Sequence, residues 1–193
     1  TAGALAPAQT AAREAVGRDP TLAVAWAAEA DLRYFAGDLD GFREAAARAL
    51  ERDPNDPDLL ADLGAKIALS GGWAEGISLV RKAQALDPFH APPLRTALAL
   101  AALRAGRADE ALAQARAIPD SEAPDGPLLR AVALHALGHK GQAAEAAGEL
   151  RARFPGLVEG LADSLRFWNL DPAVAGLLEG TLRQIDPTPK PAG

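Results

Sequence analysis

The sequence PDLLADLGAKIALSGGWAEGISLVRKAQALDPFH, residues 57–90, predicts a hairpin of two helices. Its first half carries apolar residues at the spacing of one helix face, and Gly71-Gly72 then interrupts that helix. A second apolar face begins at Trp73. Asp87-Pro88 closes the unit, because a proline disfavours helix for the residue before it. The stretch therefore indicates one antiparallel helix pair.

The closing pair recurs at a constant spacing of 34 residues, at Asp19-Pro20, Asp53-Pro54 and Asp87-Pro88. Glycines expected to end the first helix of each pair stand at a similar phase, at Gly37, Gly71, Gly106 and Gly138. A fixed period of this length indicates a solenoid of repeated helix pairs. No stretch alternates with period two, so no sheet is expected. We expect an all-α fold, a right-handed α-solenoid of antiparallel helix pairs.

The same signals divide the chain into repeats. We expect a single domain over 1–193, with a half repeat at 4–20, repeats at 23–56, 57–90, 91–123 and 124–156, a C-terminal capping helix pair at 157–186 and a disordered tail at 187–193. Aspartates are predicted to cap helices at Asp38, Asp56 and Asp171, and Asn169 is predicted to take a left-handed turn conformation. The prolines in 118–127 predict a bent loop there. A first residue other than Met predicts a piece of a longer protein.

Composition excludes several functional classes. The 193 residues are 49% hydrophobic and 24% charged, a balance typical of an ordered chain. A net charge of -6 argues against binding nucleic acid or an anionic membrane surface. The chain has no cysteine, and no stretch of about 18 uncharged apolar residues that could span a bilayer. We expect a cytoplasmic protein that contacts neither nucleic acid nor membrane.

No residue pattern predicts catalysis or a cofactor. His135 and His139 have the spacing of two metal ligands on one helix face, but Gly138 between them should end that helix. No glycine-rich phosphate loop occurs, and no serine stands in a nucleophile elbow. We expect no enzyme, no metal and no cofactor. An enzyme that uses His135 or the Asp31 and Asp62 carboxylates stays as a minor alternative.

The repeat units resemble tetratricopeptide repeats over about residues 4–156. The matching residues are an early aromatic, a Leu-Gly pair, turn glycines, small residues on the second helix and a closing proline: Trp26, Leu63-Gly64, Gly37, Gly71, Ala111, Ala143, Ala49, Ala83, Pro54, Pro88 and Pro155. The repeats at 91–123 and 124–156 match less well, because they lack the early Trp and Pro119 is displaced. The resemblance implies a non-catalytic scaffold that binds other polypeptides.

Roughly the last hundred residues have a narrower resemblance. They are similar to the C-terminal repeat regions of bacterial multidomain regulators, in which an adenylate or guanylate cyclase domain or a winged-helix domain precedes the array. Leu177-Leu178-Glu179-Gly180 and Leu182-Arg183 match the closing helix of that group, and the following residues depart from it. The resemblance implies a regulatory or assembly module of a signalling or transcription regulator, whose effector domain lies outside this chain.

The tetratricopeptide resemblance also implies a concave groove, lined by the first helix of each pair, that takes a peptide or protein. The predicted groove residues are Ala27, Asp31, Tyr34, Phe35, Asp58, Ala61, Asp62, Ala65, Thr96, Leu100, Leu103, Arg104, Leu128, Val132 and His135. This set is apolar with an acidic first half, so a partner with Arg or Lys beside apolar anchors is expected. The alternative is that these residues are only solvated.

Self-association is a further alternative to partner binding. The unpaired helix at residues 4–16 would leave an apolar flank exposed at the start of the array. Solenoids need capped ends, so this flank predicts a homodimer through the open N-terminal helix.

Overall fold

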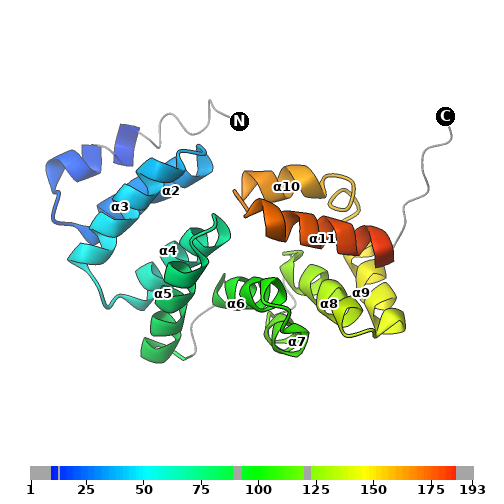
Figure 1. The fold of residues 1–193 in the computed structure, drawn as a ribbon. Coiled ribbons are helices and arrows are strands. Elements are labelled where there is room, and N and C mark those ends of the chain that lie inside the picture. Colours follow the sequence, from blue (N-terminus) through cyan, green and yellow to red (C-terminus); the bar gives the residue numbers. More distant parts are fainter. Residues whose placement is uncertain (1–9, 13, 89–92, 120–122, 186–193) are drawn as a thin grey trace. The chain divides into compact units, whose positions relative to one another are not determined.

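The computed structural model describes residues 10–12, 14–88, 93–119 and 123–185 (Figure 1). Every regular element in these ranges is a helix, which confirms the all-α prediction. Residues 10–12 and 14–18 are helical, and ten further helices follow along the chain. The helices are α2 (Ala23–Phe35), α3 (Leu39–Arg52), α4 (Pro57–Leu69), α5 (Trp73–Leu86), α6 (Pro93–Arg104), α7 (Ala108–Arg116), α8 (Asp125–Ala136), α9 (Lys140–Arg153), α10 (Leu161–Phe167) and α11 (Pro172–Ile185). The chain forms two compact units, residues 1–94 and 95–193.

The first unit contains two helix pairs, α2 with α3 and α4 with α5. Its core forms around Tyr34 and Phe42, which are fully buried with their ring centroids 5.1 Å apart in an edge-to-face arrangement. Such a pair adds about 0.5–1.5 kcal/mol beyond the burial of its area. Alanines of α3 pack against these rings, and Leu63 and Ile67 of α4 join the same cluster. Tyr34 of α2 and Phe42 of α3 therefore fill the space between the alanines of these two helices.

Two helix starts in this unit, those of α3 and α4, are capped as predicted. The Asp38 carboxylate accepts the backbone N–H of Gly41 at 3.0 Å, at the start of α3. The Asp56 carboxylate accepts the N–H groups of Asp58 and Leu59, and Pro57 occupies the first turn of α4. These carboxylates satisfy backbone donors that have no partner inside the helix.

The turns also follow the prediction. Gly37, Gly71, Gly106 and Gly138 all have positive φ, between +71° and +100°. Asn169, the residue expected in a left-handed conformation before α11, has φ 47°. Residues other than glycine are strained at positive φ, and asparagine is one of the few that tolerate it.

Helices α4 and α5 approach closely at Gly64 and Gly76. A Cβ at Gly64 would lie 2.8 Å from Leu79 Cβ and 3.0 Å from Gly76 O. A Cβ at Gly76 would overlap the backbone of α4 at Ala68 N and Gly64 O. Since backbone atoms cannot yield as a flexible side chain can, glycine at both positions sets the distance between these helices.

The second unit is built on α8 and α9. These two helices form a pair, α7 packs against α8, and α11 packs against α8, α9 and α10. Leu129, Val132 and Leu150 are fully buried here. Helix α8 begins at Asp125, so the loop expected over 118–127 ends sooner. Pro127 fits in the first turn of the helix, because a backbone N–H there has no partner inside the helix. Residues 120–122 lie outside the described part of the chain.

The C-terminal pair is less regular than expected. Its first helix, α10, starts only at Leu161, after turns over 155–160, whereas the pattern predicted order from residue 157. The tail predicted for 187–193 and the N-terminal residues 4–9 lie outside the described residues.

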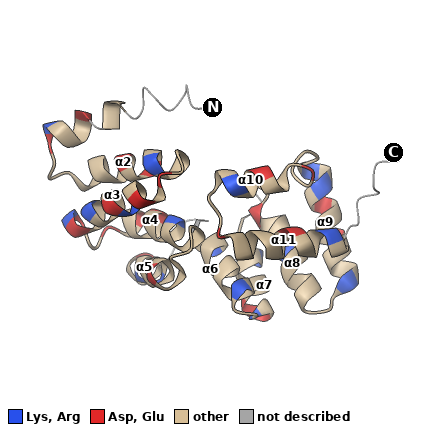
Figure 2. Ribbon diagram, turned by 45° about the horizontal axis from the view of Figure 1, so that its top comes forward, with Lys and Arg blue, Asp and Glu red and all other residues tan. Residues whose placement is uncertain are grey.

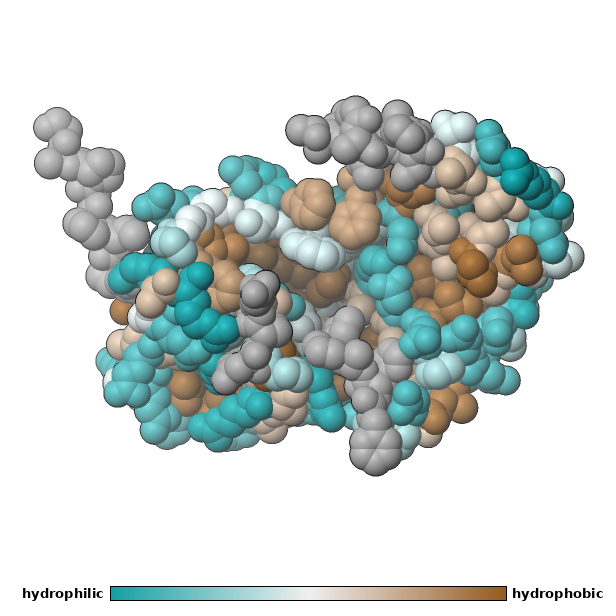
Figure 3. Space-filling view, turned by 180° about the vertical axis from the view of Figure 1, so that it is seen from behind, coloured by the Kyte–Doolittle hydropathy of each residue, from teal (hydrophilic) through white to brown (hydrophobic). Residues whose placement is uncertain are grey.

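Charged and apolar side chains are mixed on the surface. Figure 2 shows acidic and basic positions side by side on α2, α3 and α4. On the face drawn in Figure 3, apolar side chains reach the surface in several patches between hydrophilic ones. The large exposed apolar residues are Leu22, Val24, Leu86, Phe167, Trp168 and Leu177. Patches of this kind are candidate contact surfaces.

Candidate functional site

The predicted groove residues separate into exposed and buried sets. Those with exposed or half-exposed side chains are Ala27, Asp31, Phe35, Asp58 and Asp62 in the first unit and Thr96, Arg104 and His135 in the second. The buried ones are Tyr34, Ala61, Ala65, Leu100, Leu103, Leu128 and Val132. The side chains of the buried set offer almost no accessible surface to a partner. This corrects the expectation that all these residues line an open face.

The acidic pair of the first unit is already bound by a lysine. Lys66 Nζ of α4 lies 2.6 Å from Asp31 Oδ1 of α2 and 2.7 Å from both carboxylate oxygens of Asp62. The Lys66 side chain is 10% exposed, against 40% for Asp31 and 49% for Asp62. The ammonium also lies 5.8 Å from the centroid of the Phe35 ring. Lys66 is absent from the predicted set, although its i+4 spacing from Asp62 is a signal for such a pair.

The cluster keeps a negative excess, because two carboxylates share one ammonium. Burial raises the pKa of the Asp31 carboxyl above its ordinary value, and the hydrogen bond from Lys66 only partly offsets this. Burial, and secondarily the charge of Asp62, also raises the pKa of the Tyr34 hydroxyl. The exposed half of the cluster can therefore accept a further cationic donor.

The helix face of α2 that carries Asp31 also carries apolar residues. Val24, Ala27, Asp31 and Phe35 follow each other at steps of three or four residues, so they share one helix face. Val24 is 69% exposed and is not among the predicted groove residues, although its spacing from Ala27 places it on the same face. We call Val24, Ala27, Asp31, Phe35, Asp58 and Asp62 the α2–α4 face.

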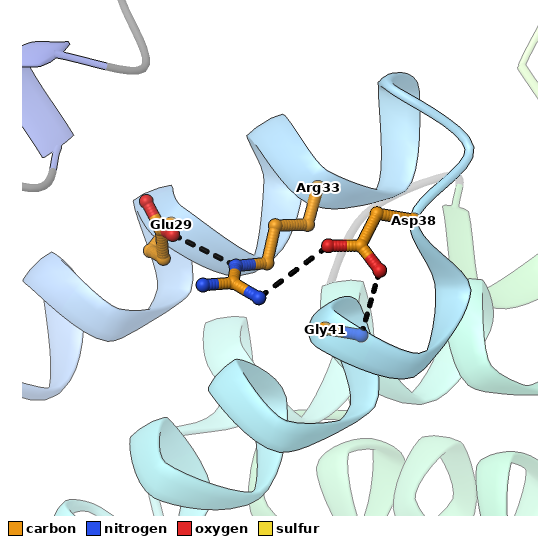
Figure 4. A network of polar contacts seen from close by, with 4 residues as sticks. All are labelled: Glu29, Arg33, Asp38 and Gly41. Carbon is orange, nitrogen blue, oxygen red and sulfur yellow. Dashed lines mark hydrogen bonds and ion pairs between the residues drawn. The ribbon is translucent and has the colours of Figure 1, made fainter.

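A polar network holds α2 against the start of α3 (Figure 4). Arg33 Nε donates to Glu29 Oε1 at 2.7 Å, and Arg33 Nη1 donates to Asp38 Oδ2 at 3.4 Å. Asp38 in turn caps α3 at Gly41, where a Cβ would overlap both Arg33 and Asp38. The network links the last turn of α2 to the cap of α3.

Trp26 anchors the other end of α2. Its ring lies under two guanidinium groups of α3, with the centroid 5.1 Å from Arg48 Cζ and 5.2 Å from Arg52 Cζ. Trp26 Nε1 and Arg52 Nε both donate to the carbonyl of Pro20. The early aromatic of this repeat therefore connects α2, α3 and the preceding Asp-Pro turn.

In the second unit two of the predicted groove residues, Thr96 and His135, contact side chains of other helices. Thr96 Oγ1 of α6 donates to Asp125 Oδ2 of α8 at 3.1 Å. Burial raises the pKa of the Asp125 carboxyl, and the Thr96 hydrogen bond opposes that shift. His135 Nε2 lies 3.1 Å from Gln184 Oε1 of α11. These two side chains therefore already have partners within the chain.

Known proteins resemble the chain in structure. No model of a known family and no curated sequence matches it. The crystal structure of YrrB, a TPR protein with an unusual peptide-binding site, has a TM-score of 0.64 and 15% identity, covering 93% of this chain and 94% of YrrB. PilW, a type IV pilus biogenesis factor, has a TM-score of 0.69 and 19% identity, covering 96% of this chain and 88% of PilW. Pseudomonas aeruginosa pilF has a TM-score of 0.67 and 20% identity, covering 96% of this chain and 86% of pilF.

The chain has a tetratricopeptide-repeat fold. The α-solenoid prediction is confirmed by these structures and by the serial helix pairs. Within the fold, Gly64 has the close-contact position expected from the motif, and Trp26 has the early aromatic position. At these identities the likeness establishes the fold, and the function has to be argued from the residues.

The two histidines considered as metal ligands do not lie on one helix. Helix α8 ends at Ala136, and His139 lies beyond Gly138, before α9. Over the described ranges, no three His, Asp or Glu side chains gather as a metal site would require. In the same ranges, no helix has the length and apolar character needed to cross a bilayer.

Proposed function

We propose that the chain is a tetratricopeptide-type scaffold that binds another polypeptide on the α2–α4 face. One observation carries this proposal. Asp31 and Asp62 share a single lysine and remain about half exposed, the ring of Phe35 lies near the same lysine, and Val24 is exposed on the helix face of α2 that carries Asp31. A segment with an Arg or Lys next to an aliphatic side chain complements this surface in charge and hydropathy.

The partner chemistry can be tested without a known partner. A displayed library of random peptides is selected on the full chain, and enriched peptides are measured by fluorescence anisotropy. The proposal expects Arg or Lys beside an aliphatic residue in the enriched sequences. It expects Asp62→Asn and Val24→Ser each to weaken those peptides roughly tenfold.

The matched control is Glu75→Gln, which removes one exposed carboxylate of the same unit from α5. It should leave the affinity unchanged. Equal affinity for wild type, Asp62→Asn and Val24→Ser would show that the α2–α4 face is not the site. Failure to enrich any peptide would contradict polypeptide binding itself.

We also propose that the chain is a cytoplasmic module of a larger bacterial signalling or transcription regulator, and not itself an enzyme. The support is the resemblance of the residues at 177–183, which lie in α11, to the closing helix of such regulators. The reading frame upstream of Thr1 tests this directly. A cyclase or winged-helix domain there agrees with the proposal, and a start codon next to Thr1 contradicts it.

A further inference from the structure

Two neighbouring aromatic side chains are exposed at the end of α10. Phe167 is 57% exposed and Trp168 is 49% exposed. Their ring centroids are 5.8 Å apart, with an angle of 85° between the ring planes, so the rings meet edge to face. Phenylalanine and tryptophan ordinarily bury most of their surface in a folded chain. This exposed ring pair is therefore a candidate contact surface.

The chemistry of the ring pair suits a proline-rich segment. Proline has no backbone N–H that must find a partner, and its ring packs against the faces of aromatic side chains. Proline-rich segments favour the extended polyproline II conformation before they bind, so binding costs them little conformational entropy. Aromatic faces also attract a lysine ammonium. The pair thus fits an extended segment in which a lysine stands between prolines.

The chain itself contains such a segment. Residues 187–191 read Pro-Thr-Pro-Lys-Pro, and they begin two residues after the end of α11. A lysine between two prolines occurs at no other place in the sequence. Residues 187–191 lie outside the described ranges, so the argument for their position rests on the length of chain that follows Ile185.

This length is sufficient to reach the ring pair. Helices α10 and α11 pack against each other in the second unit, and Trp168 stands four residues before the start of α11 (Figure 1). Helix α11 has 14 residues, so its ends are about 21 Å apart. The six residues 186–191 span about 19 Å in polyproline II geometry. A segment that turns back along α11 therefore brings Pro191 near the level of Trp168.

The outward side of α11 leaves room for this path. Gly176, Leu177 and Gly180 are exposed or half-exposed there, and a Cβ added at either glycine would have no atom within 4 Å. None of the three is charged, and Lys190 is the one charged residue of 187–193. An extended segment can therefore follow α11 without a clash and without placing a charge against a buried one.

We propose that Phe167 and Trp168 form a binding site for a proline-rich segment, and that residues 187–191 of the same chain occupy it. The short tether gives the segment a high effective concentration, so a few weak contacts are enough to hold it. A segment of another protein with lysine between prolines would compete for the same rings. This site is independent of the α2–α4 face, which lies in the other unit.

The contact can be measured on the full chain. The sequence has no cysteine and three tryptophans, so a nitroxide attached at Ala192→Cys is unique and 5-fluorotryptophan gives three fluorine signals. Trp168→Phe assigns the signal of Trp168. If the segment is held at the rings, this signal should relax several-fold faster with the nitroxide oxidised than after its reduction.

The decisive comparison uses two tails of equal length. Replacing Pro187, Pro189 and Pro191 with serine keeps the reach of the tail and removes the chemistry that the rings bind, so the relaxation enhancement should fall several-fold. Thr188→Ala leaves all three prolines and should behave as the wild type. Phe167→Ala removes one ring of the pair and should release the tail as the serine variant does. The serine variant changes no helical residue, so it tests the contact even where Phe167→Ala disturbs the fold.

Two outcomes would overturn the proposal. One is an equal relaxation enhancement of the Trp168 signal in the wild-type and serine-tail chains, which would show that the rings do not hold the segment. The other comes from mixing nitroxide-labelled chains without fluorine and fluorinated chains without nitroxide. An enhancement as large as that within one chain would assign the bound segment to a second copy.

Discussion

Lys66 Nζ lies 2.6 Å from Asp31 Oδ1, so one ammonium joins α4 to α2 across 35 residues of sequence. The same ammonium binds both oxygens of Asp62 on its own helix. The cluster thus has two roles that can be separated by mutation. It holds the two first helices of the unit together, and it sets the charge of the α2–α4 face.

Lys66→Met should destabilise the chain, because it leaves two half-buried carboxylates facing each other without a cation. A double-mutant cycle with Asp31→Asn, measured by urea unfolding, should give a coupling free energy of about 1–3 kcal/mol. A coupling near zero would show that Lys66 and Asp31 only lie near each other.

Gly76→Ala should destabilise the first unit by about 1–3 kcal/mol, because its Cβ would overlap backbone atoms of α4 and push the helices apart. The matched control is Gly148→Ala in α9, where no atom lies within 4 Å of a Cβ. That change should stabilise the chain by about 0.5–1 kcal/mol through helix propensity. Thermal unfolding of both variants tests the contrast, and the same sign for both would contradict it.

Asp125→Asn should change how stability depends on pH. Burial raises the pKa of the Asp125 carboxyl in the folded chain above its value in the unfolded chain. The folded chain therefore holds this proton to higher pH, so the free energy of unfolding falls as pH rises from about 4 through the raised pKa. Relative to Asp125→Asn, wild type should lose stability over that window.

The measurement for Asp125 is urea unfolding of both chains at several pH values. Asp109→Asn, at the exposed start of α7, is the control for removing one carboxylate. A stability difference between wild type and Asp125→Asn that does not vary with pH would rule out the burial effect.

Asp38→Ala should cost about 1 kcal/mol, because α3 loses the cap at Gly41 and Arg33 loses one of its two acceptors. Asp38→Asn keeps an oxygen for the cap and removes the charge that faces Arg33. It should therefore cost clearly less, since the exposed ion pair contributes little. If both variants unfold at the same urea concentration, the cap is not what Asp38 supplies.

Helix ends, caps and turns were predictable from sequence because they depend on near neighbours. Asp38 reaches a donor three residues away, and Asp56 reaches donors two and three residues away. Gly71 and Asn169 have the positive φ that their place after a helix predicts. The repeat period also predicted which helices pair, since each pair can bury its apolar strip only against the next pair.

The site was predicted less completely because it depends on contacts between distant segments. Asp31 and Asp62 were expected to be open to a partner, and Lys66, far from Asp31 in sequence, binds both. Val24 follows the face of α2 and was missed, although its exposure makes it part of the same surface. Leu128 and Val132 were placed on an open groove, yet they are buried in the unit that α11 completes.

By itself, the sequence determined the helices, their caps, the left-handed turns and the solenoid class, because local backbone preferences and a strict period act over a few residues. Only the tertiary structure decided which charges are already paired and which apolar face is already covered. These depend on where Lys66 and α11 lie relative to α2 and α8, and such contacts leave no periodic signal in the chain.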